Sequence, residues 1–139
     1  MTIENEDQLE KLRTVGRLVA RTLAAMGEAL EPGMTTKELD DLGRALLDKE
    51  GARSAPELTY DFPGATCISV GPDCAHGIPD ETVIKAGDLI NIDVSAELDG
   101  YFGDTGASFA VPPTSPRIER LCDDAVRLGS YQSLAAGIP

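Results

Sequence analysis

Aromatic residues are scarce in this chain of 139 residues: they make up 4%, and tryptophan is absent. Hydrophobic residues still reach 42%, which is enough for the core of one domain of ordinary size. Basic residues are also few, with 12 Lys and Arg against 24 Asp and Glu and a formal net charge of −12. Nucleic-acid surfaces need clustered Lys and Arg to displace counterions, so we expect no direct nucleic-acid contact. The acidic balance is compatible with cation binding.

Long apolar runs are also missing, and none approaches the length that spans a bilayer. The start, MTIENEDQLEKL, is acidic and lacks the apolar segment of a secretory signal, so we expect a cytoplasmic protein with no membrane contact. The three cysteines are odd in number and have no C-x-x-C spacing, which favours a reducing compartment. Cys67 and Cys74 could ligate a metal together with His76, although a single pair of thiols is weak support for a zinc site.

Two amphipathic helices are predicted within residues 7–50. The first covers residues 7–30 and ends at Pro32-Gly33, because its apolar side chains recur at helical spacing: Leu9, Leu12, Val19, Leu23, Met26 and Leu30. The second runs from about 36 to 50, since Thr35 followed by Glu38 matches a capping box. Its apolar stripe is Leu39, Leu42 and Leu46.

The rest of the chain predicts strands and one more helix. Residues 52–65 contain Pro and Gly and are expected to be mostly loop, and residues 66–70 form a short strand. A loop with the only histidine precedes two strands that complete the strand region 66–111. Ser115 can cap a final helix over 116–136, with Gly137 as its stop. We therefore expect residues 1–139 to form one incomplete α+β domain, with helices packed on a small antiparallel sheet.

The segment LINIDVSAELDGYFGDTGASF reads as two strands joined at Asp99-Gly100, a strong signal for a two-residue type I′ turn. With this loop, Leu98 faces Tyr101 and Ser95 faces Asp104. Asp93, Ser95 and Asp104 then share one face, and the two aspartate Cα atoms are roughly 7–8 Å apart. Ile90, Ile92, Val94 and their neighbours share the other face, which is built to be buried.

The aspartate pair has two interpretations. Two solvated surface carboxylates are the ordinary explanation for an isolated pair. A cation site is the other, because carboxylates placed diagonally repel each other unless a cation or a proton relieves them. Gly103 and Gly106 also indicate that something approaches the backbone closely. The hairpin alone leaves both interpretations open.

Five further blocks occur in a characteristic order. They are CIS (67–69), HGIPD (76–80), a Gly-Asp turn (87–88), NIDV (91–94) and DGYFGDT (99–105). In this order and spacing the chain resembles the N-terminal half of bacterial-type methionine aminopeptidases, members of the pita-bread metallopeptidase family. The resemblance extends over essentially the whole chain.

The resemblance implies a site. Asp93 would be a bidentate ligand of one divalent metal, Asp104 would bridge two, and His76 would act in catalysis beside the substrate. Phe62 and Tyr60 would line the methionine pocket, although Pro56 stands where many members have a Cys. The metals would be Co²⁺, Mn²⁺, Fe²⁺ or Zn²⁺ and would generate a nucleophile from water at neutral pH.

The implied function is removal of the N-terminal methionine from nascent polypeptides whose second residue is small, with the ribosome as a candidate location. Members carry three further ligands, a histidine and two glutamates, beyond the matched region. We therefore expect the chain alone to be inactive or nearly so, and a full-length form to be a monomer. Two alternatives stay open: a prolidase or aminopeptidase P relative, and a non-catalytic pita-bread protein that binds partners.

Overall fold

The structure is a computed structural model that describes the backbone of residues 3–135 and side chains as far as residue 127. The elements follow in the order α1 (Glu6–Ala29), α2 (Thr36–Lys49), β1 (Arg53–Ser54), α3 (Ala55–Tyr60), β2 (Cys67–Val70), β3 (Leu89–Leu98), β4 (Tyr101–Ala110) and α4 (Pro116–Ala135). The expected end of the last helix at Ala136 and its stop at Gly137 lie outside the described residues. None of the helices in the described part combines the length and apolar character that a bilayer crossing needs.

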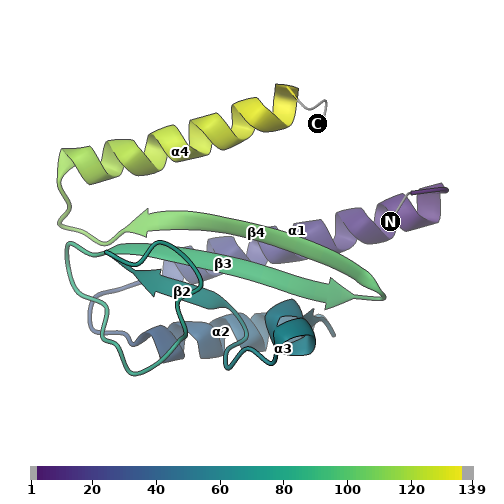
Figure 1. The fold of residues 1–139 in the computed structure, drawn as a ribbon, viewed down its shortest axis with the longest axis horizontal. Coiled ribbons are helices and arrows are strands. Elements are labelled where there is room, and N and C mark those ends of the chain that lie inside the picture. Colours follow the sequence, from purple (N-terminus) through teal and green to yellow (C-terminus); the bar gives the residue numbers. More distant parts are fainter. Residues whose placement is uncertain (1–2, 136–139) are drawn as a thin grey trace.

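The sheet is antiparallel throughout and is organised around β3. Along one edge β3 pairs with β4 over its full length, and along the other it pairs with β2 and then with the short β1. Figure 1 shows β2, β3 and β4 side by side with α1 and α2 behind them. The α+β prediction is confirmed, with four strands in place of the expected three.

The prediction that residues 52–65 are mostly loop is wrong. Ser54 caps α3 by accepting a hydrogen bond from the Glu57 backbone N–H, and Pro56 lies in the first turn, where its missing N–H costs nothing. Arg44 of α2 holds Glu57 through two hydrogen bonds of 2.9 and 2.6 Å. A short helix needs such tertiary support, and sequence periodicity over six residues does not reveal it.

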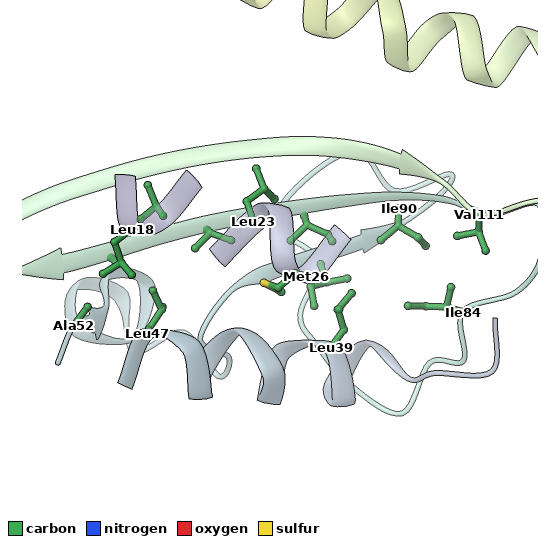
Figure 2. Packing of buried hydrophobic residues seen from close by; sticks show 14 residues of the cluster. Leu18, Leu23, Met26, Leu39, Leu47, Ala52, Ile84, Ile90 and Val111 are labelled. Carbon is green, nitrogen blue, oxygen red and sulfur yellow. The ribbon is translucent and has the colours of Figure 1, made fainter. Parts of the chain in front are cut away.

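The core lies between the sheet and the two long helices (Figure 2). Its fully buried members include Val19 and Met26 of α1, Leu39 and Leu47 of α2, and Ile90 of β3. The stripe of α2 is therefore displaced from the expected one, since Leu47 is more buried than Leu46. Helix α4 contacts β4 and lies away from the labelled core residues.

The capping box of α2 is confirmed, since Thr35 and Glu38 exchange side-chain and backbone hydrogen bonds. One turn further on, Asp40 is 5% exposed and faces the segment that leads into β2. Its carboxylate accepts hydrogen bonds from the backbone N–H groups of Ala65 and Thr66 and from the Thr66 hydroxyl, at 2.7–3.0 Å. Asp40 therefore fixes the start of β2 against α2.

Replacing Asp40 with Ala is expected to lower the free energy of unfolding by about 2–5 kcal/mol, because it leaves two buried N–H groups without acceptors. The matched control is Asp41→Ala, which removes an exposed ion pair with Lys37 and is expected to cost less than about 1 kcal/mol. Urea unfolding followed by circular dichroism measures both. Equal midpoints for the two variants would contradict the anchoring role of Asp40.

Candidate metal centre

The β3–β4 hairpin has the register expected from the sequence. Leu98 pairs with Tyr101 and Ser95 pairs with Asp104. The two loop residues have positive φ, 53° at Asp99 and 86° at Gly100, as a type I′ turn requires. Asp99 tolerates this left-handed backbone better than most side chains, which explains why an Asp-Gly pair stands at the loop. The turn and the register therefore follow from the local sequence.

Alternation along β3 separates a buried face from a face with the aspartates. Ile92, Val94 and Ala96 are fully buried against the helices, whereas Asp93 and Ser95 lie on the opposite face. A side chain at Gly103 would meet the backbone of α1 at Val15, so this glycine admits the helix. A side chain at Gly106 would lie 3.2 Å from the Ile92 carbonyl oxygen, a tight approach, and 3.5 Å from the Asp93 carboxylate, an ordinary contact. Both glycines therefore mark the close approaches that the sequence indicated.

The two aspartates open into a cleft of about 610 Å³. All five residues that the sequence singled out line this cleft: Tyr60, Phe62, His76, Asp93 and Asp104. Four further lining residues, Pro56, Cys67, Ser95 and Gly103, entered the sequence analysis in other roles, whereas Ala55, Thr59 and Phe102 did not enter it. The wall is largely apolar and the acidic pair lies within it, so the cleft combines a hydrophobic surface with a concentration of negative charge.

The electrostatics of the pair favour a positive charge in the cleft. Burial raises the pKa of Asp93 above its ordinary value, and the carboxyl group of Asp104 raises it further through charge and hydrogen bonding, while His76 opposes the shift. Cys67 lies opposite Asp93 in the β2–β3 register, and burial, with the Asp93 charge next, raises the pKa of its thiol. The ionised form of Asp93 is thus disfavoured, and a cation shared with Asp104 would relieve that cost.

The donor set fits a divalent cation in part. Two carboxylates offer oxygen ligands of the kind that Mn²⁺, Fe²⁺ and Co²⁺ accept. Among the described residues, no group of three or more His, Cys, Asp or Glu side chains is placed to hold a metal. The weaker alternative, with Cys67, Cys74 and His76 as ligands, is therefore wrong. An ion bound by Asp93 and Asp104 would therefore take its remaining ligands from water, from the substrate or from residues outside the described part of the chain.

A closely packed loop carries His76 to the cleft. The Gly77 carbonyl accepts a hydrogen bond from the Ile68 N–H, and the Gly77 N–H donates to the Ser69 hydroxyl at 3.0 Å. A side chain at Gly77 would lie 2.2 Å from the Ile68 carbonyl oxygen, so only glycine fits. His76 itself has φ of +57°. These hydrogen bonds fix the loop to β2, and within the loop His76 adopts a left-handed backbone conformation.

Helix α3 supplies the apolar wall. The Thr59 hydroxyl donates to the Ala55 carbonyl at 2.6 Å, which satisfies it within the helix. Phe62 is half-buried beyond the end of α3, while Tyr60 is 83% exposed at the rim. Phe62 is therefore the stronger of the two predicted pocket residues. A Ser-x-Pro-Glu helix start was the sequence signal for this wall.

Glu97 shares the face of the aspartates but serves the fold. It is 6% exposed, and its carboxylate accepts hydrogen bonds from the Arg53 side chain at 2.7 Å and from the Gly100 N–H. Both contacts lower the pKa of Glu97. Glu97 thus fastens β1 and the hairpin turn, and its carboxylate is engaged by these contacts rather than turned to a metal.

The chain is similar in sequence to methionine aminopeptidases. It is 48% identical over 139 residues to methionine aminopeptidase 2 of Bacillus subtilis, covering 97% of this chain and 56% of that protein. It is 45% identical over 126 residues to a methionine aminopeptidase of Staphylococcus epidermidis, covering 90% of this chain and 50% of that protein. The chain thus spans about half the length of the curated relatives that it matches.

Solved structures agree on the fold. The methionine aminopeptidase of Rickettsia prowazekii superposes with a TM-score of 0.82 at 35% identity, covering 88% of this chain and 50% of that one. The prolidase of Pyrococcus furiosus gives a TM-score of 0.67 at 19% identity over 85% of this chain and 34% of that one, a likeness of fold alone. The expected half of a pita-bread fold is confirmed. Residues 10–135 match metallopeptidase family M24, and the chain belongs to that family.

Proposed function

We propose that this chain contributes the aspartate pair, a catalytic histidine and a substrate pocket to a metal-dependent aminopeptidase that removes N-terminal methionine. The observation that carries the proposal is one cleft that brings together Asp93, Asp104 and His76 with the apolar wall at Phe62. The high identity to methionine aminopeptidases supports this choice of substrate. The substrates are nascent polypeptides with a small second residue, which places the activity in the cytoplasm.

The aspartates are the proposed metal ligands: Asp93 would hold one of two divalent ions, and Asp104 would be shared by both. A bound divalent ion lowers the pKa of water and polarises the scissile carbonyl. The chain's own groups then have separate tasks. The aspartates would keep the divalent ions beside the place where the free amino group and the first carbonyl of a peptide substrate would lie. His76 donates or accepts a hydrogen bond at the scissile peptide and so orients it.

The pocket is proposed to hold the methionine side chain. Phe62, the buried Cys67 and Thr59, whose hydroxyl is satisfied within α3, all line the cleft and make part of its surface apolar. Burying a methionine side chain contributes about 1.5–3 kcal/mol, and the flexible thioether adapts to such a surface. The cleft wall therefore favours an unbranched apolar side chain over a charged one.

Ligand supply limits the chain acting alone. Two carboxylates have four oxygens, and two ions with about four to six partners each need more donors. The relatives are about twice as long as the matched region, so the remaining ligands would come from sequence beyond this match. We therefore expect little or no turnover by the 139-residue chain and activity once those residues are supplied.

A prolidase or aminopeptidase P activity is the second candidate, because enzymes with those names share the fold. It is weaker, since the matched solved chains of that kind are only 19–24% identical. A non-catalytic binding protein is weaker again. Such a protein has no need of two carboxylates that repel each other within one cleft, and both are present.

The substrate is tested with a fusion of this chain to the remaining C-terminal residues of the Bacillus subtilis relative, loaded with Mn²⁺ or Co²⁺. We expect the fusion to hydrolyse Met-Gly-Ser and to leave Ala-Pro intact, because the apolar wall selects methionine. Release of free methionine is measured by chromatography. Hydrolysis of Ala-Pro without release of methionine would replace the proposal by a prolidase activity.

Asp104→Asn in the same fusion is expected to lower kcat at least about a hundredfold, because the bridging carboxylate and several kcal/mol of metal-derived stabilisation are lost. Asp99→Asn is the matched control: it removes one charge from the same hairpin, and Asn tolerates the positive φ of the turn. Initial rates on Met-Gly-Ser measure both variants. An Asp104→Asn rate within a few-fold of the Asp99→Asn rate would remove Asp104 from the metal centre.

His76→Ala is expected to lower kcat by about tenfold to a hundredfold, since a hydrogen bond to a polarised group contributes about 1.5–3 kcal/mol. Metal binding should stay the same, because His76 is not a proposed ligand. Steady-state kinetics and Mn²⁺ calorimetry measure the two properties separately. Unchanged kinetics would assign His76 a structural role, and lost metal binding would make it a ligand.

A further inference from the structure

Ser95 makes a direct contact with the carboxylate proposed to bridge the metals. It lies opposite Asp104 in the β3–β4 register, and its hydroxyl donates a hydrogen bond to Oδ1 of Asp104. The two side chains come from different strands, so the bond joins the strands within the cleft. Ser95 is half-buried and lines the same cleft as both aspartates.

Few other groups hold Asp104 in place. It is exposed, and among the described side chains the Ser95 hydroxyl donates a hydrogen bond to its carboxylate. The neighbouring Asp93 is a carboxylate too, and in its ionised form it can only accept. An exposed aspartate without such a bond turns freely about its terminal torsion, which has broad, roughly two-fold preferences. The Ser95 hydroxyl therefore selects one orientation of the carboxylate.

The hydroxyl suits this task because it is neutral. It leaves the negative charge of the pair intact, and it uses one of about four acceptor positions on the carboxylate. The remaining positions on both oxygens stay open to a cation. A carboxylate that is already oriented loses less conformational freedom on binding, which strengthens the affinity.

We propose that Ser95 is a positioning residue, which holds Asp104 in the orientation in which its carboxylate binds a divalent cation. The inference rests on the proposed function, because it takes Asp104 as a ligand. Groups that orient metal ligands typically change affinity or activity by about ten- to a hundredfold when they are removed.

The fold does not depend on this hydrogen bond. Asp104 is exposed to solvent. If the Ser95 hydroxyl is removed, a water molecule can therefore donate the hydrogen bond in its place. The buried groups that stabilise the hairpin, Ile92 and Val94, lie on the opposite face. A substitution at Ser95 can therefore test metal binding without unfolding the hairpin.

The test compares Mn²⁺ binding by the 139-residue chain and three variants, using titration calorimetry with the metal alone. We expect Ser95→Ala to raise the Kd about ten- to a hundredfold. Ser95→Thr keeps a hydroxyl on the same carbon and should bind as the unmodified chain does. Ser108→Ala is the matched control, since Ser108 lies on the same face of the hairpin and its hydroxyl accepts a hydrogen bond from Asn91 at 3.2 Å.

Paramagnetic broadening of backbone amide signals by Mn²⁺ gives a second readout, which locates the ion. In the unmodified chain, broadening should affect the amides around both Asp93 and Asp104. In Ser95→Ala it should weaken around Asp104 relative to Asp93. A purely structural role for Ser95 would reduce broadening at both aspartates equally.

Three outcomes overturn the inference. If Ser95→Ala binds as tightly as Ser108→Ala, Ser95 does not position the ligand while the metal site itself stands. If Ser95→Thr is as weak as Ser95→Ala, the effect does not come from the hydroxyl. If the unmodified chain shows no heat and no broadening with Mn²⁺, the same comparison is made in the fusion that supplies the remaining ligands. If that fusion also shows neither, the proposed metal site fails, and the role of Ser95 fails with it.

Discussion

The register of one antiparallel hairpin is the constraint on which the candidate site depends. Because side chains alternate along a strand, a slip of one residue would turn Asp93 into the core and expose Ile92 and Val94. The Asp99-Gly100 turn and the burial of the apolar face both oppose that slip. The forces that fold the hairpin therefore also place two carboxylates side by side, although the carboxylates destabilise each other.

Three other segments complete the cleft, and each is tied to the fold by contacts of its own. Asp40 fixes the start of β2, which carries Cys67 to the cleft. The Gly77 backbone hydrogen-bonds to Ile68 and Ser69 in the middle of β2 and so holds His76 nearby. The Arg44–Glu57 ion pair anchors α3, whose far end brings the apolar wall. The site is thus assembled from separate anchors around a single strand pair.

The hairpin could be predicted from the sequence because its signals are local: an Asp-Gly turn and period-two alternation. The wall could not. Helix α3 depends on Arg44, which lies 13 residues before Glu57, and a long-range ion pair leaves no periodic pattern. Cys67 lies in the predicted strand 66–70, but its place at the cleft follows from pairing with Asp93 on β3. The contact of Ser95 with Asp104 was implicit in the predicted register and required side-chain geometry to be recognised.

The central claim is that Asp93 and Asp104 share a divalent cation. Anomalous diffraction from crystals of this chain soaked in Mn²⁺ tests it most directly, because the signal locates the ion without reference to activity. The account predicts a peak between the two carboxylates, about 2.0–2.4 Å from an oxygen of each. A cleft without a peak, in crystals where Mn²⁺ binds at other acidic side chains such as Asp73 or Glu119, would contradict it.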